Sequence, residues 1–235
     1  MNPFDAVILS FTQTLVRQSS TFDTLVQVWA SNNLLKSGVI VPLTWWAWFA
    51  AGEDRRRVRE RLLAMLGGAV VSIFCARGLA LALPFRYRPL HDPNIDFVLA
   101  YGWSTIPMDG WSSFPSDHAA LFFAIAVGLF AVSRGVGIVA LLYATFFVGL
   151  PRVILGLHYP SDVVAGAVIG ATAALMSTGY FAKTKLVRKV AGWEESFTGP
   201  FYAALFLLTY QIADIFETSR AVASTLRDIA RTFLR

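Results

Sequence analysis

Residues 114–133, which read FPSDHAALFFAIAVGLFAVS, decide the fold class. A short polar signature ends at His118, and no charged residue follows between Ala119 and Ser133. A helix that is apolar on every side needs an apolar environment all around it, either a large core or a membrane. The whole chain favours the membrane, because 56% of its 235 residues are hydrophobic and 15% are charged, against about 25% charged in soluble domains.

Apolar stretches of similar length lie on both sides of this segment. They predict an all-α fold, a polytopic membrane helix bundle of about six transmembrane helices, formed as one domain over residues 1–235. Residues 1–34 are predicted to be an interfacial amphipathic segment, because Phe4, Val7 and Phe11 recur at helical spacing, and residues 217–235 an amphipathic tail. The predicted spans are 35–51, 62–83, 118–133, 135–150, 163–181 and 200–216.

The positive charges lie in short segments between the apolar stretches. A net charge of +5 would suggest nucleic acid in a soluble protein, but basic loops are what membrane orientation requires, so we predict no nucleic-acid partner. The arginine cluster at 55–61 is expected in the cytoplasm, which places 84–114 and 152–162 on the outer side. One question stays open: if 200–216 spans fully, the basic tail lies outside against this rule, whereas a re-entrant or surface segment avoids the conflict.

Two of the three histidines in the chain stand at the mouths of predicted spans on that outer side. His118 and His158 are accompanied there by Arg88, Arg152 and Asp162. This set suits phosphoryl transfer, in which catalysis is mostly positioning and charge stabilisation, because the planar arginine fork binds two phosphate oxygens at once. A purely structural role explains a single histidine at a membrane surface, but it does not explain five such groups on one face.

His158 and Asp162 are four residues apart, so their side chains meet if a helix begins near Tyr159. Asp162 would then bond one imidazole nitrogen and fix the tautomer, which leaves the other nitrogen free to attack phosphorus. Attack produces a phosphohistidine. His118 is the candidate general acid for the leaving oxygen, and the candidate base for the water that hydrolyses the intermediate.

Ser116 and Asp117 stand at the predicted start of the span that begins at His118. Free backbone N–H groups and the helix dipole favour an anion there, so both residues are predicted to lie at bound phosphate, with the Ser116 hydroxyl as a donor. Simple N-capping explains the same two residues, and the two roles can share one site. The chain has no C-x-x-C pair and no acidic cluster suited to Mg²⁺, so we predict no metal and no cofactor.

These residues resemble the motifs of the type 2 phosphatidic acid phosphatase superfamily, which includes vanadium haloperoxidases and glucose 6-phosphatase. The motifs are K-x6-R-P, P-S-G-H and S-R-x5-H-x3-D, and their matches here lie within residues 81–162. The matching residues are Arg88-Pro89, Pro115-Ser116-Asp117-His118, and Arg152 with His158 and Asp162. The resemblance implies a membrane phosphatase in which His158 is the nucleophile and His118 the acid.

Three positions depart from those motifs. Leu81 stands at the lysine position, Asp117 at the glycine position and Pro151 at the serine position. The lost lysine and the P-S-D-H run resemble the bacitracin-resistance type of undecaprenyl-diphosphate phosphatase. That resemblance implies a bacterial enzyme of the plasma (inner) membrane, with its site facing the periplasm. It would hydrolyse undecaprenyl diphosphate to undecaprenyl phosphate and so recycle the lipid carrier of peptidoglycan biosynthesis.

Two other functions stay open. The same residues would serve a phosphatase for phosphatidate, phosphatidylglycerol phosphate or lipid A, and polar groups inside a membrane protein also occur in transporters. Against a transporter, the charged residues gather at one membrane face rather than along a path through it. In every case the bilayer is a partner, and a polyprenyl or other lipid phosphate is the expected substrate; the oligomeric state is left open.

The missing lysine leaves the predicted site one cation short. Arg77 lies four residues before Leu81 on the same helical face, and its long side chain is a candidate ligand for a second phosphate. Arg86 is the competing candidate. Alternatively, Arg77 pairs with a carbonyl or a polar side chain between helices, because an isolated arginine in a membrane is costly. His91 follows Arg88 closely, and we favour a loop histidine.

Overall fold

The structure is a computed structural model that describes residues 1–50, 52, 54–104, 110–219 and 225. In these ranges all regular structure is helical, which confirms the predicted all-α class. The α-helices are α1 (Pro3–Leu15), α2 (Ser20–Ser31), α3 (Asn33–Ser37), α4 (Ile40–Ala50), α5 (Arg55–Ala82), α6 (Asp117–Val132), α7 (Arg134–Tyr143), α8 (Leu150–Ile154), α9 (Pro160–Gly179), α10 (Lys185–Ser196) and α11 (Thr198–Ala213).

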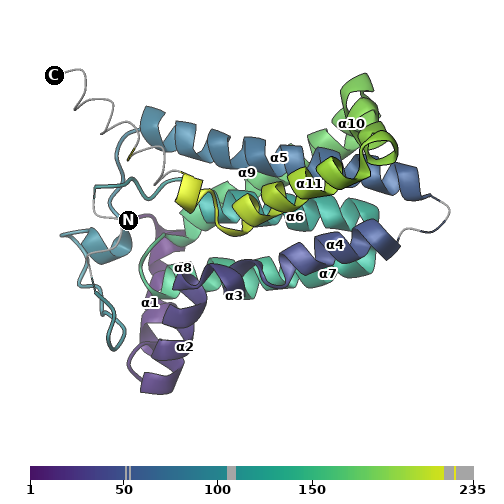
Figure 1. The fold of residues 1–235 in the computed structure, drawn as a ribbon. Helices are drawn as coiled ribbons and strands as arrows, with labels where there is room; N and C mark the ends of the chain where they lie inside the picture. Colours follow the sequence, from purple (N-terminus) through teal and green to yellow (C-terminus); the bar gives the residue numbers. More distant parts are fainter. Residues whose placement is uncertain (51, 53, 105–109, 220–224, 226–235) are drawn as a thin grey trace.

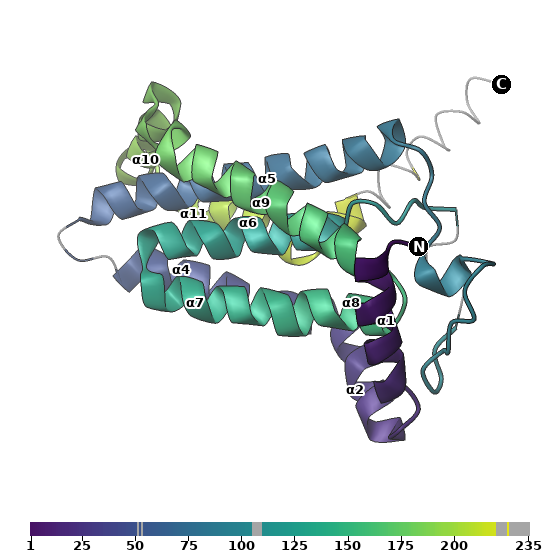
Figure 2. The ribbon, with the colours of Figure 1, turned by 180° about the vertical axis from the view of Figure 1, so that it is seen from behind.

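Helix α6 is the centre of the bundle. It packs against α5, α7 and α9, which run alongside it (Figures 1 and 2). Its buried side chains, among them Leu121, Phe122 and Leu129, share one core with Leu62 and Met65 of α5. Because other helices surround α6, it needs no polar stripe, and its sequence has none.

Three helical segments of the described chain are long and apolar enough to cross a membrane: Arg55–Ala82, Arg134–Ile154 and Pro160–Lys183. They correspond to the second, fourth and fifth predicted spans, and the third corresponds to α6, a shorter apolar helix. The segment Arg134–Ile154 contains a π-helical turn at Ala144–Gly149 just before Pro151. Proline has no N–H for the preceding turn, and such wide turns are frequent next to functional residues.

The first predicted span, residues 35–51, is wrong as a single helix. Helix α3 ends at Ser37, and α4 begins at Ile40 after a turn at Gly38. The break leaves the Lys36 and Ser37 side chains buried in the protein. A lysine in hydrocarbon is costly, and the turn keeps Lys36 out of contact with lipid.

The N-terminal segment forms two helices rather than one. Helices α1 and α2 run across the end of the bundle, whereas the long helices run along it (Figures 1 and 2). The predicted apolar stripe is exposed at Phe4, Val7 and Phe11, while Asp5 and Thr12 are buried. Helix α1 thus exposes large apolar side chains, although Leu9 is buried, which is compatible with a position at a membrane surface.

Two glycines bring α9 close to α6. A Cβ on Gly166 would lie 2.2 Å from the carbonyl oxygen of Ser116, and one on Gly170 would lie 2.2 Å from that of Ala120. A larger residue at either position would push the helices apart. The close approach fixes the first turn of α6 against the first turn of α9, which carries Asp162.

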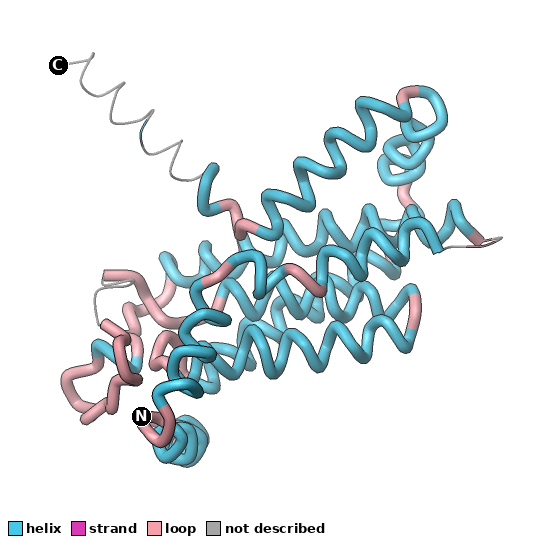
Figure 3. The backbone as a smooth tube through the Cα atoms, turned by 60° about the horizontal axis from the view of Figure 1, so that its bottom comes forward, coloured by secondary structure: helices cyan, strands magenta, loops and turns pink. Residues whose placement is uncertain are grey.

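The described parts of the segment between α5 and α6 lie at one end of the bundle, near α1 and α2 (Figures 1 and 2), and Figure 3 draws them as pink loop close to the N-terminus. We call this the loop end. The sixth predicted span returns to it as α11, because the Ile215 carbonyl that follows α11 accepts a hydrogen bond from Arg77 Nη2 at 3.2 Å. Most of the predicted amphipathic tail, residues 217–235, lies outside the described residues.

Candidate active site

The predicted site residues meet at the loop end. Six of them are buried, with 0–6% of each residue exposed: Arg88, Ser116, His118, Arg152, His158 and Asp162. Charged groups buried to this degree cost free energy unless they are paired or serve a ligand. The partners of each group therefore indicate its role.

His158 is held by the backbone around it. Gly156 turns the chain with a φ of 67°, and the His158 N–H donates to the Arg152 carbonyl at 3.2 Å. The ring Nδ1 lies 2.8 Å from the Ser113 carbonyl oxygen, so Nδ1 carries the proton. Nε2 is then unprotonated and faces Arg88, whose Nη1 is 3.4 Å away. Burial, followed by the charges of Arg88 and Arg152, lowers the pKa of His158 well below its ordinary value, so the ring is neutral at neutral pH.

The predicted hydrogen bond from the His158 ring N–H to the Asp162 carboxylate is absent. Oδ2 of Asp162 stands 3.9 Å from Nδ1, because the Ser113 carbonyl occupies the hydrogen-bonding position. The carboxylate instead accepts hydrogen bonds from Arg86 Nη1 at 2.5 Å, from the Tyr159 N–H at 2.8 Å and from the Ser113 hydroxyl. Asp162 therefore acts on His158 through space, and Ser113 touches both residues.

His118 lies in the first turn of α6, directly after Asp117. Its ring Nδ1 and its backbone N–H both lie 2.8 Å from Oδ1 of Asp117, whose Oδ2 is 3.2 Å from Arg77 Nε. Asp117 thus contacts both His118 and Arg77, and it orients the His118 ring. This arrangement does not fit the predicted contact of Asp117 with phosphate. Ser116 caps α6 by accepting from the Ala119 N–H at 3.3 Å, and in the described residues its hydroxyl hydrogen has no acceptor.

Arg88 and Arg152 are the predicted cations that keep no carboxylate partner among the described residues. Arg88 Nη1 donates to the Leu157 carbonyl at 2.5 Å, and Arg152 Nη2 donates to the Ala30 carbonyl at 3.3 Å. In the same part of the chain, the Nε of each guanidinium is buried without a hydrogen-bond partner. A buried charge without a partner is costly, so this geometry fits a site that binds an anion.

The two arginines proposed for a second phosphate are engaged elsewhere. Arg86 bonds the Asp162 carboxylate, its Nη2 lies 2.7 Å from Oδ2 of Asp5, and its guanidinium carbon lies 4.0 Å from the centre of the Tyr159 ring. Arg77 of α5 pairs with Asp117 of α6 and donates to the Ile215 carbonyl, which is the alternative to phosphate binding, a structural role between helices. Leu81, at the motif's lysine position, is 83% exposed. His91 lies half-buried in the short turn Pro89–His91.

Sequence reasoning missed three residues at this site. Asp5 is fully buried and accepts hydrogen bonds from the Ser161 N–H and hydroxyl at 2.8 and 2.7 Å. Burial raises the pKa of Asp5, but the bonds from Ser161 and Arg86 outweigh it and leave that pKa below its ordinary value. The second is Ser113, whose backbone carbonyl contacts the His158 ring; a backbone contact leaves no signal in the sequence. The third is Lys36, which is buried in α3. Asp5 and Lys36 could have been noticed, because each is a charged residue inside an apolar segment.

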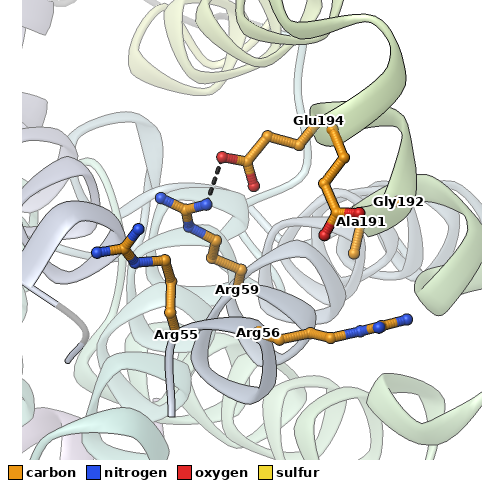
Figure 4. A pocket seen from close by; sticks show the side chains of 7 residues that line it. Arg55, Arg56, Arg59, Ala191, Gly192 and Glu194 are labelled. Carbon is orange, nitrogen blue, oxygen red and sulfur yellow. Dashed lines mark hydrogen bonds and ion pairs between the residues drawn. The ribbon is translucent and has the colours of Figure 1, made fainter. Parts of the chain in front are cut away.

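A different polar pocket lies at the other end of α5. Arg55, Arg56 and Arg59 of α5 line it with Glu194 of α10, and Arg59 pairs with Glu194 (Figure 4). Helix α5 has 28 residues, about 42 Å at 1.5 Å per residue, so this pocket is remote from the histidines. Among the described residues, no group of three or more His, Cys, Asp or Glu side chains could hold a metal ion.

Known proteins resemble this chain over about half of their length. The bacitracin transport permease protein BcrC of Bacillus licheniformis is 47% identical over 124 residues, 51% of this chain and 56% of the relative. The lipid A 1-phosphatase of Rhizobium johnstonii is 40% identical over 117 residues, 46% of this chain and 44% of the relative. A decaprenylphosphoryl-5-phosphoribose phosphatase of Mycobacterium tuberculosis is 34% identical over 117 residues, 50% of this chain and 59% of the relative. No solved structure matches the chain significantly.

The family model for the PAP2 superfamily matches residues 61–185, which is 125 of the 235 residues. That range runs from α5 to the start of α10 and includes Arg88, His118, Arg152, His158 and Asp162. The resemblance drawn from the three motifs is confirmed, and so is the likeness to the bacitracin-resistance type. The chain belongs to the PAP2 superfamily.

Proposed function

We propose that this chain is a membrane lipid phosphatase that hydrolyses undecaprenyl diphosphate to undecaprenyl phosphate and inorganic phosphate. One observation carries the proposal: a neutral His158 presents Nε2 beside Arg88, at a buried site whose arginines lack carboxylate partners in the described chain. The superfamily, together with relatives named as lipid phosphatases, supports the reaction class. The likeness to BcrC and the lost motif lysine support the finer substrate.

In the first half of the reaction, His158 Nε2 attacks the terminal phosphorus. The N–P bond forms as the bridging P–O bond breaks, and the ring becomes positively charged while Nδ1–H stays bonded to the Ser113 carbonyl. The Asp162 carboxylate, 3.9 Å from Nδ1, stabilises that charge. Arg88 and Arg152 bind the oxygens of the transferred group, as guanidinium forks do for phosphates.

His118 moves the protons in both halves. In its protonated form, with Nδ1–H bonded to Asp117, the ring donates its Nε2 proton to the bridging oxygen, which leaves as undecaprenyl phosphate, and His118 becomes neutral. In the second half, neutral His118 takes a proton from water, whose oxygen attacks phosphorus, breaks the N–P bond and releases inorganic phosphate. Asp117 holds the His118 ring by Nδ1 throughout, which leaves Nε2 for the reacting atoms.

The competing substrates are phosphatidate, phosphatidylglycerol phosphate and lipid A, and the name of the Rhizobium relative favours the last of these. Phosphate release by purified protein in detergent separates them. We expect the highest kcat/KM with undecaprenyl diphosphate, and no release from a folded His158→Ala variant. A kcat/KM that is higher for any of the other lipids would refute the substrate assignment.

A transporter is the non-enzymatic alternative, and the name of the Bacillus relative favours it. Detergent micelles hold no gradient, so turnover there cannot depend on transport. Phosphate release that needs sealed vesicles and a gradient would favour the transporter.

The orientation is part of the same proposal, since the carrier diphosphate would be hydrolysed on the periplasmic side of the inner membrane. The arginine cluster at the start of α5 supports a cytoplasmic location for the end opposite the site. Cys75→Ser removes the only cysteine, and Asp96→Cys then adds one at an exposed position of the loop end. An impermeant thiol reagent should label Asp96→Cys in intact spheroplasts; labelling only after lysis would reverse the orientation.

A further inference from the structure

The site holds a third buried cation that the mechanism above does not use. Lys36 lies in the short helix α3 and is 4% exposed. Within the described chain, no hydrogen bond and no ion pair joins its ammonium group to another residue. Burying a charged lysine without such a partner costs free energy, which a bound anion would offset.

Lys36 interacts electrostatically with the groups that act on the substrate. Its charge interacts with those of Arg152 and Asp117, and it also acts on His118. Two backbone contacts explain the position of Lys36. Arg152 reaches the Ala30 carbonyl at the end of α2, just before α3, and the Tyr143 hydroxyl of α7 donates to the carbonyl next to Lys36.

Two carboxylates after α11 offer a competing explanation for Lys36. The charges of Asp214 and Glu217 act on it. However, neither lies within ion-pair distance, and both accept from the Asn33 amide, at 3.1 and 3.4 Å. They moderate the cost of burying Lys36 without engaging its ammonium group.

The charge balance of the site leaves room for a second phosphate. Arg77 is paired with Asp117, and Arg86 is paired with Asp5 and Asp162. A terminal phosphate carries about −1.5 to −2 charges at neutral pH, which two arginines match. At the site, the basic side chains without an ion-pair partner among the described residues are Arg88, Arg152 and Lys36, one more than a single phosphate requires.

We propose that Lys36 binds the lipid-linked phosphate of a diphosphate substrate, at a site that lacks the lysine of the first motif, where Leu81 stands. The inference rests on the proposed function. His118 protonates the leaving oxygen, so a cation whose charge acts on His118 also stabilises the negative charge that develops on the leaving phosphate. A lipid monophosphate has no phosphate in that place, and Lys36 therefore makes the site selective for diphosphates.

Farnesyl diphosphate and farnesyl phosphate are suitable probes, because they share a short lipid and differ by one phosphate. Lys36→Met should lower kcat/KM about 10- to 100-fold for the diphosphate, the usual worth of a hydrogen bond to a charged group, and only about threefold or less for the monophosphate. Lys36→Arg should keep most of the activity on the diphosphate. Lys185→Met, on α10 at the far end of the bundle, is the matched control and should change neither substrate.

Binding is measured separately in a His158→Ala background, where neither probe turns over. Calorimetric titration should show that Lys36→Met weakens farnesyl diphosphate binding about 10-fold or more and leaves farnesyl phosphate binding unchanged. Equal weakening of both probes, or of neither, would overturn the inference. If the parent protein hydrolyses neither probe, the proposed function fails, while the two dissociation constants still decide the role of Lys36. Loss of the fold in both Lys36→Met and Lys36→Gln, with Lys36→Arg folded, would assign Lys36 to structure and also overturn it.

Discussion

Replacing Asp162 by asparagine separates the charge of this residue from its shape. Three donors reach the carboxylate: Arg86 Nη1 at 2.5 Å, the Tyr159 N–H at 2.8 Å and the Ser113 hydroxyl. An asparagine amide has one accepting oxygen, so its NH₂ must face either Arg86 or the Tyr159 N–H. The His158 tautomer should survive, because the Ser113 carbonyl at 2.8 Å fixes it independently of Asp162.

The size of the effect follows from the distance between Asp162 and the ring. In the proposed mechanism, His158 gains a positive charge when it becomes phosphorylated, and Asp162 Oδ2 stands 3.9 Å from its Nδ1. Coulomb's law with an effective dielectric constant of about 20 gives about 4 kcal/mol at that distance, or about 10³-fold in rate. Arg86 shares the carboxylate charge, so we expect kcat to fall about 10²- to 10³-fold. If the Asp162 carboxylate alone fixed the His158 tautomer, its replacement would lower kcat about 10⁴-fold.

The assay is rapid quench with substrate labelled at the terminal phosphate, which measures phosphohistidine formation before product release. Asp5→Asn is the matched control, because it removes a partner of Arg86 and leaves Asp162 beside the ring; its loss should stay below about tenfold. Thermal unfolding in detergent checks that both variants fold. A kcat of Asp162→Asn within about fivefold of the parent would refute the charge argument, and a loss of about 10⁴-fold would show that Asp162, not Ser113, fixes the tautomer.

Three further outcomes are expected. His118→Asn should accumulate phosphohistidine in the same quench experiment with a diphosphate substrate. The lipid phosphate is a good leaving group, so the first half still proceeds, but no base remains to deprotonate the water of the second half. Absence of accumulated phosphohistidine would exclude His118 as that base. The acid limb of kcat/KM should lie below pH 6.5 or so, because a lowered His158 pKa keeps the ring unprotonated down to that range, and Arg88→Gln should move the limb to higher pH. Gly170→Leu should lower the free energy of unfolding by about 1–3 kcal/mol, measured by thermal unfolding, whereas Gly78→Leu, which meets no atom within 4 Å, should not.

Continuous apolar runs identified the central helices of the fold because the bundle surrounds them with apolar neighbours. Helix α6 begins and ends within one residue of the predicted span. The hydropathy pattern predicted the wrong structure where a polar side chain is buried by parts of the chain that are distant in sequence. The span predicted at 35–51 breaks beside Lys36, and the apolar stripe of α1 faces outward because Asp5 faces the protein. Hydropathy does not record which partners a polar residue will meet.

At the site, local spacing predicted proximity but not bonding. The four-residue interval brought Asp162 to 3.9 Å from the His158 ring, yet the hydrogen bond goes to a carbonyl that is 45 residues earlier in the chain. The pairing of Arg77 with Asp117, 40 residues apart, was equally out of reach. A backbone acceptor has no side-chain signature, and ion pairs between helices depend on how the helices dock, so neither follows from a single sequence.

The segment before the family match contacts the candidate site. The PAP2 region, residues 61–185, contains the two site histidines and the arginines proposed to bind phosphate, and residues outside that region contact its polar groups. Asp5 of α1 bonds Arg86 and Ser161, and the Ala30 carbonyl of α2 anchors Arg152. These contacts come from residues outside the range that the family model matches, so the first 60 residues add positions at which the candidate site can differ between chains that share the motifs.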